Sequence, residues 1–118
     1  MDDPKELARI LKVLSVDTRV RIVCFLRGRA LCVNALAARL GVTQGAVSQH
    51  LRVMRDAGLV IDEKRGFYVH YRLNEQTLAA WREAIDQLLG PTCRVSQKTK
   101  GTDQCAASKK DVARNRKT

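Results

Sequence analysis

Short amide, hydroxyl and guanidinium side chains recur at helical spacing within residues 42–60. The helical period places one set of them on a common side: Gly45, Ser48, Gln49, Arg52 and Asp56. Gln44 stands at the N-terminal entrance to the same face. Amides and guanidiniums make paired hydrogen bonds with base edges in the major groove of DNA. The chemistry that this face favours is therefore hydrogen bonding to duplex DNA, and we expect Arg52 to contact a guanine or a phosphate. A buried helix with an incidental polar face is the plainer alternative.

Two helices joined by a short turn would position this face. The opposite side of the second helix is apolar and predicts contact with a core through Val47, Leu51 and Met54. Thr43 is a good N-cap, and Gly58 stands where a helix would end in a left-handed residue. Val33–Leu40, closed by Gly41, supplies the first helix of a helix-turn-helix.

Two strand-like runs follow, and their pattern predicts a hairpin. Leu59–Lys64 and Phe67–Leu73 are joined at Arg65-Gly66, with Lys64 and Arg65 at the tip. A basic hairpin directly after a helix of this kind is typical of the wing of a winged helix-turn-helix, which touches phosphates or the minor groove. The residues expected to contact DNA are Thr43, Gln44, Gly45, Ser48, Gln49, Arg52, Lys64 and Arg65.

Three segments together resemble the ArsR/SmtB family of metal-sensing repressors. They are SVDTRVRIVCFL at 15–26, LCVNALAARLGVTQGAVSQHLRVMRDAGLV at 31–60 and GFYVHYRL at 66–73. The resemblance implies a mainly helical, winged helix-turn-helix fold with a small β-hairpin, ordered as four helices, two strands and a last helix. It also implies a homodimer that occupies a double-stranded DNA operator and leaves it when an effector binds. No cofactor is expected for DNA binding itself.

Composition agrees with a nucleic-acid partner and divides the chain in two. The chain has 118 residues and a net charge of +10, so one domain is expected. Residues 91–118 hold eight of the 22 Lys and Arg residues and two of the 12 Asp and Glu residues. We expect a folded domain over 1–90 and a flexible, basic, Cys-containing tail over 91–118. A basic chain also suits RNA or an acidic membrane surface.

The pattern of the termini and of the apolar runs predicts a location in the cytoplasm. No apolar run approaches the length of a membrane span, so no membrane partner is expected. The first residues lack the basic start and apolar core of a signal peptide. Cysteines in a cytoplasmic protein are expected to be thiols rather than structural disulfides.

The remaining helices offer more apolar surface than a helix-turn-helix and a wing require. A first helix is expected over about 4–14, a second from a cap at Asp17 to about Arg27, and a last one over about 75–89, capped by Asn74. Simple packing within the chain is one interpretation. The resemblance favours the other, a two-fold dimer interface that includes Leu7, Leu11, Trp81 and Leu88, and such a dimer suits paired half-sites on DNA.

The four cysteines call for separate interpretations. Cys24 lies in the second, apolar helix and is expected in the core, since free cysteine is often buried as a small hydrophobic residue. Cys32 immediately precedes the third helix, where a thiol gains reactivity. Arsenic sensors of the family have a Cys-Val-Cys motif there, and this chain reads Cys32-Val33-Asn34.

One thiolate cannot hold a soft metal ion well, so an ion at Cys32 needs further ligands from elsewhere in the chain. Cys93 and Cys105 in the C-terminal residues are the candidates. Three thiolates suit a soft ion such as arsenite, antimonite, cadmium or lead. The resemblance also offers a redox or persulfide switch between Cys24 and Cys93, and a repressor without a metal effector stays open.

Other classes of function find little support in the sequence. No Gly-rich phosphate loop, metalloprotease helix or nucleophile elbow is present, so an enzyme is not expected. His50 and His70 fall in the DNA-reading part and are interpreted as structural or DNA-proximal. A chromatin-like protein would bind all sequences alike, and the polar helix face argues against that.

Overall fold

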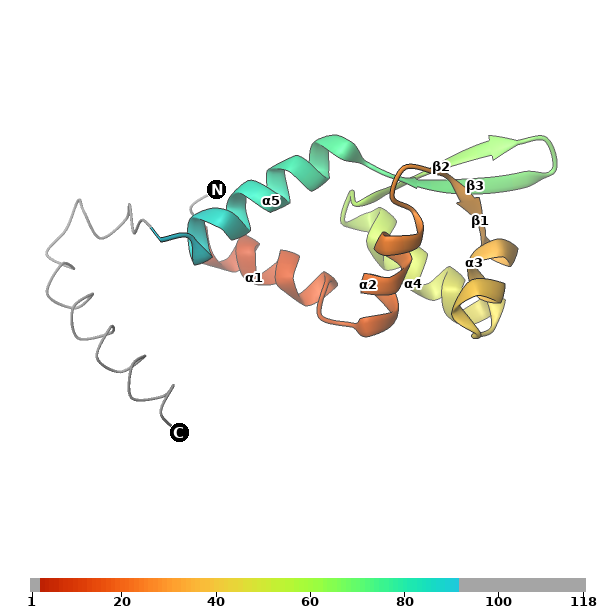
Figure 1. Ribbon diagram of the computed structural model, residues 1–118, viewed down its shortest axis with the longest axis horizontal. Coiled ribbons are helices and arrows are strands. Elements are labelled where there is room, and N and C mark those ends of the chain that lie inside the picture. The colour runs from red at the N-terminus through yellow and green to blue at the C-terminus, as the bar shows by residue number, and fades with distance from the viewer. Residues whose placement is uncertain (1–2, 92–118) are drawn as a thin grey trace, which may run out of the picture. The chain divides into compact units, whose positions relative to one another are not determined.

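The computed structural model describes residues 3–91 of the chain, and the fold is mainly helical with a small antiparallel sheet (Figure 1). Its elements, in chain order, are α1 (Pro4–Val13), α2 (Asp17–Phe25), β1 (Leu31–Cys32), α3 (Val33–Leu40), α4 (Gln44–Asp56), β2 (Val60–Arg65), β3 (Tyr68–Leu73) and α5 (Glu75–Leu89). The chain divides into two units, residues 1–84 and 85–118, and of the second unit the structure describes 85–91. The predicted fold class is confirmed.

The helix-turn-helix consists of α3, α4 and the turn between them. Gly41 ends α3 with a φ of 72°, and its amide donates to the carbonyl of Ala37. The Thr43 hydroxyl accepts from the amide of Ala46 at 3.1 Å and so caps α4, as the sequence predicts. These two ends fix where the turn begins and stops, and therefore how α4 is held against α3.

The C-terminal end of α4 is closed by a Schellman arrangement. The amide of Leu59 donates to the carbonyl of Met54, and the amide of Gly58, whose φ is 82°, donates to that of Arg55. Leu59 and Met54 are both fully buried, which supplies the apolar contact that accompanies this motif. The chain thus leaves α4 in a fixed direction and enters the first strand of the wing.

One apolar core joins the helix-turn-helix to α1, α2 and the sheet. Val47, Leu51 and Met54 of α4 are buried as predicted. The other large side chains that are almost completely buried are Ile10, Ile22, Leu26, Leu36 and Leu59. Because α4 uses one whole side for this core, its other side is left for solvent or a partner.

The wing has one strand more than the sequence predicts. The sheet order is β1-β3-β2, and β1 pairs with β3 through two residues only, Leu31 with Tyr71 and Cys32 with His70. A two-residue strand is too short to give an alternating pattern, so sequence reasoning missed it. The predicted turn at Arg65-Gly66 is also shifted by one residue, since Arg65 pairs with Tyr68 and the loop is Gly66-Phe67.

The second helix differs from its prediction in three ways. Val16 is the N-cap residue and Asp17 is the first helical residue, whose carboxylate accepts from the amide of Thr18. The helix ends at Phe25 rather than near Arg27, and Ile22 is its one fully buried residue. The sequence predicts a helix that is apolar on most sides and therefore central, but Val20, Arg21 and Cys24 are exposed, so the helix lies partly at the surface. In α5, Asn74 accepts from the amides of Gln76 and Thr77 and caps the helix as predicted.

Candidate nucleic-acid interface and thiol positions

The outward side of α4 is a continuous exposed face of small polar residues. Its members, all exposed, are Gln44, Gly45, Ser48, Gln49 and Arg52. The structure places these predicted site residues together on one side of one helix, opposite the buried stripe. Their donors and acceptors project from a rigid element with fixed ends, which is what base recognition in a groove requires.

Thr43 has a different task from the rest of the predicted set. Its hydroxyl oxygen is already the acceptor for the amide of Ala46. The side chain therefore fixes the start of α4, although its own exposed position leaves it at the edge of the polar face.

The basic residues of the wing form a small network around one carboxylate. Glu63 accepts from Arg72 at 3.0 Å and from Arg65 at 3.1 Å. The hydrogen bonds from Arg72 first and Arg65 second lower the pKa of Glu63 below its usual range. Lys64, which is exposed, belongs to none of the ion pairs among residues 3–91. Of the two predicted wing contacts, Lys64 is thus the free cation and Arg65 is already shared with the protein.

An ion pair also joins the wing to the end of α4. Arg55 in the last turn of α4 lies 3.5 Å from the Asp62 carboxylate on β2. Both side chains are well exposed, so the pair contributes little to stability. The direction of the hairpin at this point is instead set by the backbone hydrogen bonds that close α4.

His50 is a structural residue, in agreement with one of its two interpretations. Its Nδ1 accepts from Nε of Arg19 at 3.2 Å, and the same guanidinium donates to the carbonyl of Val13. The imidazole therefore connects α4 to α2 and to the end of α1.

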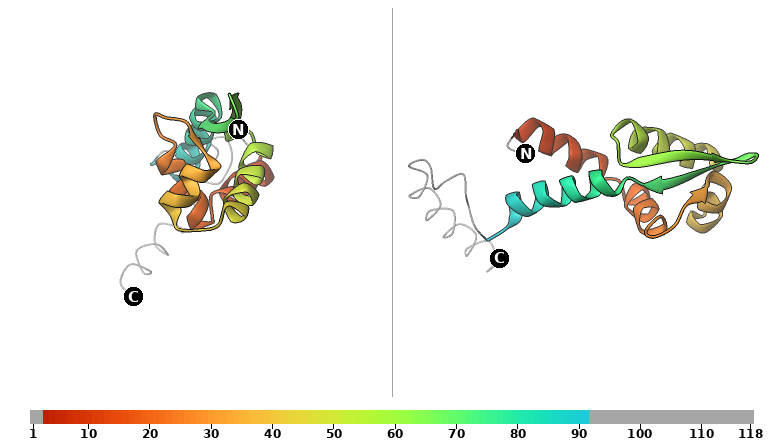
Figure 2. Two further views of the ribbon diagram at one scale, coloured as in Figure 1. Left: turned by 90° about the vertical axis from the view of Figure 1, so that its right-hand side faces the viewer. Right: turned by 90° about the horizontal axis from the view of Figure 1, so that it is seen from above.

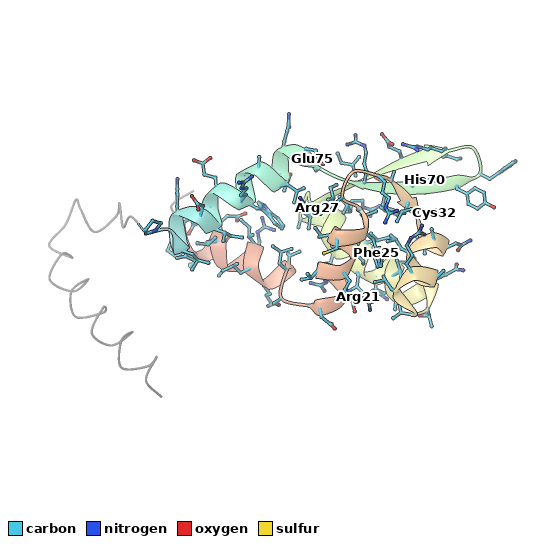
Figure 3. The ribbon with its side chains drawn as sticks, in the orientation of Figure 1. Arg21, Phe25, Arg27, Cys32, His70 and Glu75 are labelled. Carbon is cyan, nitrogen blue, oxygen red and sulfur yellow. The ribbon has the colours of Figure 1, made fainter. Side chains whose placement is uncertain are left out.

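Cys32 and His70 lie directly opposite each other on β1 and β3 (Figure 3). Side chains in such a pair share one face of the sheet, with Cβ atoms about 4.5–5.5 Å apart. Nδ1 of His70 is buried and has no hydrogen-bond partner in the described part of the chain. Sequence reasoning missed this pairing because it depends on the short strand β1. Cys32 is also the N-cap residue of α3, where its side chain makes no capping hydrogen bond.

The donors that residues 3–91 offer to a soft ion are few. Within that range there is no group of three or more His, Cys, Asp or Glu side chains arranged to hold a metal. The imidazole of His70 and the thiol of Cys32, on residues paired across the sheet, are donor types that suit a soft or borderline ion. Cys93 and Cys105, the other predicted ligands, lie outside the described residues.

The expectation for Cys24 is wrong. The thiol is free and exposed on α2, because the buried side of this short helix is the side of Ile22. Val20, one turn earlier, is also exposed. Cys24 is therefore available to reagents in a single chain.

The four predicted dimer residues differ in what they present to solvent. Leu11 is 39% exposed and Leu88 is 54% exposed, while Leu7 is partly buried. Trp81 is 5% exposed and packs in the core of its own chain, so it has little surface left for a partner. The expectation that Trp81 lines an interface stays a prediction, and this burial does not favour it.

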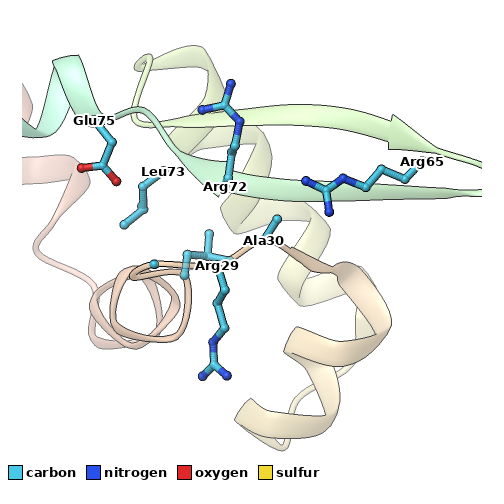
Figure 4. A pocket seen from close by; sticks show the side chains of 8 residues that line it. Arg29, Ala30, Arg65, Arg72, Leu73 and Glu75 are labelled. Carbon is cyan, nitrogen blue, oxygen red and sulfur yellow. The ribbon is translucent and has the colours of Figure 1, made fainter.

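A cavity of about 280 Å³ lies between the loop after α2 and the start of α5. Arg65, Arg72 and Glu75 are among the residues that line it (Figure 4). The guanidinium of Arg29, another lining residue, points away and its Nε donates to the carbonyl of Phe25. Since Arg65 and Arg72 are engaged with Glu63, the charged groups of this cavity do not converge on a ligand.

Comparison with known proteins places the chain among regulators. Residues 17–62 match the family described as bacterial regulatory proteins of the arsR family. The arsenical resistance operon repressor of Escherichia coli K12 is 38% identical over 78 residues, which are 65% of this chain and 66% of the relative. The transcriptional activator HlyU of Vibrio cholerae is 34% identical over 88 residues, 75% of this chain and 79% of HlyU. The chain belongs to the ArsR family.

Solved structures share the architecture of this ArsR-family chain. Reduced HlyU from Vibrio cholerae matches with a TM-score of 0.60 at 32% identity, over 73% of this chain and 90% of HlyU. A homodimeric winged helix-turn-helix DNA-binding domain from Mycobacterium bovis matches with a TM-score of 0.59 over 75% of this chain and 85% of that domain. At 24% identity the second likeness shows the fold alone. The fold and the matched relatives are those of DNA-binding transcriptional regulators, not of enzymes.

The likeness to ArsR-family relatives covers part of their length. The chain spans 59–66% of the first curated relatives that it matches. No helix within residues 3–91 is long and apolar enough to cross a lipid bilayer.

Proposed function

We propose that this ArsR-family protein is a sequence-specific DNA-binding repressor that a thiol-reactive effector releases from its operator. The observation that carries the proposal is the exposed polar face of α4, which stands opposite a completely buried apolar stripe. A solvated helix face more often carries Glu and Lys pairs, whereas Gln49 and Arg52 are suited to adenine and guanine edges. Lys64 on the wing adds a phosphate contact that positions the face.

Selection of duplexes from a random pool tests this proposal. The wild-type protein is expected to enrich a two-fold symmetric sequence, since each α4 reads one half-site. Gln49→Ala or Arg52→Ala should lower affinity for that sequence by about 5- to 150-fold, since a paired base contact is worth about 1–3 kcal/mol. Arg82→Ala, at an exposed arginine of α5, is the matched control and should bind as wild type. Equal losses on selected and scrambled duplexes for both variants of α4 would remove base reading.

The proposal includes a homodimer with apolar surface from α1 and α5. Leu11 and Leu88 are large apolar side chains that a monomer leaves in water. A dimer contacts two half-sites where a monomer contacts one. A variant that no longer dimerises should therefore also lose affinity for the operator.

For the effector, we propose arsenite or another soft metal ion that reacts at Cys32. Support comes from the position of Cys32 at the N-terminus of α3, from the neighbouring His70, and from the arsenical resistance repressor of Escherichia coli. Cys93 and Cys105 are proposed as further ligands on sequence grounds. Allosteric coupling is typically about 1–3 kcal/mol, which corresponds to a roughly 5- to 150-fold loss of operator affinity.

Serine variants distinguish the thiols. Cys32→Ser should bind the selected duplex normally and should not be released by arsenite or cadmium, while Cys24→Ser should respond as wild type. The measurement is a titration of fluorescently labelled duplex with reduced protein, with and without each ion. Normal release of Cys32→Ser would refute the metal site.

A second candidate is a thiol redox switch that uses Cys24 and Cys93. The exposure of Cys24 favours it, and so does the likeness to HlyU, of which a reduced form has been solved. A disulfide or persulfide survives chelators and is reversed by reductants, whereas an arsenite complex is reversed by competing dithiols. Release of DNA by polysulfide that depends on Cys24 and not on Cys32 would favour this candidate. Release by neither reagent would leave a repressor without a thiol effector.

A further inference from the structure

The tip of the β2–β3 hairpin exposes consecutive apolar side chains. Phe67 is 99% exposed and Tyr68 is 57% exposed, and Val69 after them is exposed as well. A phenylalanine that touches nothing in its own chain keeps its full ring in water, where it contributes nothing to the fold. Single exposed apolar residues are common on protein surfaces, but a run of three at one projecting tip calls for a partner.

The turn holds Phe67 in a defined position. Arg65 and Tyr68 form the last pair of the ladder, so the loop has two residues only, Gly66 and Phe67. Gly66 has a φ of 64° at the first loop position, the pattern of a tight type II′ turn. The hairpin extends past α3 and α4 at this end (Figure 2). Phe67 is thus the apex of a short rigid finger and not part of a long loose loop.

The charges around the ring select the kind of partner. Residues 64–68 contain Lys64 and Arg65, two aromatic residues and no acidic residue, and of the two cations Arg65 is paired with Glu63 on the same strand. Cations beside an exposed aromatic ring suit a polyanion with apolar interior surfaces, which is the description of a nucleic acid. A purely apolar protein partner would leave Lys64 without a counter-charge.

The same hairpin is attached to the element that the proposed function assigns to the major groove. The Arg55–Asp62 pair joins the last turn of α4 to β2 at 3.5 Å. With α4 in the major groove, a finger that starts at its C-terminal end reaches the neighbouring minor groove. Apolar side chains inserted there separate adjacent base pairs and kink the duplex toward the major groove.

We propose that Phe67 is a wedge that inserts into the minor groove beside each half-site, so that the protein reads how easily the flanking DNA deforms. The inference rests on the proposed function of α4. Pyrimidine–purine steps such as TA and CA unstack most readily, so they should be preferred at the flank. Specificity would then reach base pairs that α4 does not touch.

Duplex selection with matched wing variants tests the wedge. Wild-type protein should enrich TA or CA steps at a fixed distance outside both half-sites. Phe67→Ala should keep the half-site sequence, lose the flanking preference and bind about 5- to 150-fold more weakly, in line with the loss of one aromatic contact to a base. Phe67→Leu keeps an apolar wedge and should retain the preference. Val20→Ala removes an exposed apolar group of α2, outside the hairpin, and should behave as wild type.

The bend of the selected duplex provides a second readout. Energy transfer between dyes at the two ends should report a kink of about 20–90° with wild-type protein, and a smaller one with Phe67→Ala. An unchanged flank and bend in Phe67→Ala would overturn the wedge while half-site selection still supports the repressor. If Phe67→Ala no longer selected the half-site sequence, the wedge would also be overturned. Absence of any enriched sequence with wild-type protein would instead overturn the proposed function.

Discussion

Leu51 and Arg52 are adjacent in the chain and about 100° apart around α4, one facing the core and the other solvent, so truncating each to alanine should separate folding from DNA binding. Leu51 is 1% exposed, within the core stripe. Arg52 is exposed and makes none of the ion pairs found among residues 3–91. The two side chains thus have different partners, although one peptide bond connects their residues.

The expected sizes of the two effects follow from burial. Leu51→Ala leaves a cavity between α4 and the rest of the core, which costs about 2–5 kcal/mol of unfolding free energy. In a domain of this size each kcal/mol lowers Tm by about 4–8 °C. Arg52→Ala leaves no cavity and should change the unfolding free energy by less than about 0.5 kcal/mol. Its operator affinity should fall by about 1–3 kcal/mol if the guanidinium pairs with a guanine.

Urea unfolding and a DNA titration on the same samples provide the assay. Leu51→Ala should shift the unfolding midpoint strongly and, at temperatures where it stays folded, bind DNA with nearly wild-type affinity. Arg52→Ala should show the reverse. If Arg52→Ala lowered the unfolding free energy by more than about 1 kcal/mol, the assignment of this side chain to the exposed polar face of α4 would be refuted.

Three further outcomes are expected. Lys64→Ala should weaken binding to all duplexes alike and reduce the slope of log affinity against log salt by about one, which electrophoretic titrations at several salt concentrations would measure. Glu63→Gln should free Arg65 and so strengthen non-specific DNA binding at low salt. Because the arginines lower the pKa of Glu63 from 4.5, acid should reproduce this effect only when the pH falls through that lowered pKa. Stronger binding that begins above pH 4.5 would contradict the pairing. Leu11→Glu or Leu88→Glu should give a folded monomer by sedimentation that has lost operator binding, and a monomer that still binds the full operator would exclude the dimer.

The parts of the fold that could be predicted are those whose pattern repeats over several turns. The apolar stripe of α4 recurs over three positions and is flanked by Thr43 and Gly58, so both its direction and its ends follow from residue type. The polar face then follows by geometry, since it is the side that the core does not use. The site residues on α4 were accessible to sequence reasoning for this reason.

What could not be predicted depends on contacts between segments far apart in the chain. The strand β1 has two residues and exists only because β3 pairs with it, so the meeting of Cys32 and His70 has no local pattern. Cys24 stands in an apolar stretch, but α2 is short and turns only the side of Ile22 inward. Trp81, expected at a surface that a second chain covers, is covered by its own chain. An apolar helix face in the sequence does not reveal which of the two chains will cover it.

The position of Cys32 has a consequence for how operator release would be divided between the two protomers. This residue is both the N-cap of α3, which supports α4, and the rung opposite His70 on the wing strand β3. A chemical change at its thiol would act on both elements that are proposed to contact DNA in the same protomer, through one or two residues and without passing through the proposed dimer interface. Release would then be graded and not all-or-none. A mixed dimer with one Cys32→Ser protomer would give up one half-site under effector and hold the other, with an affinity between those of the two homodimers.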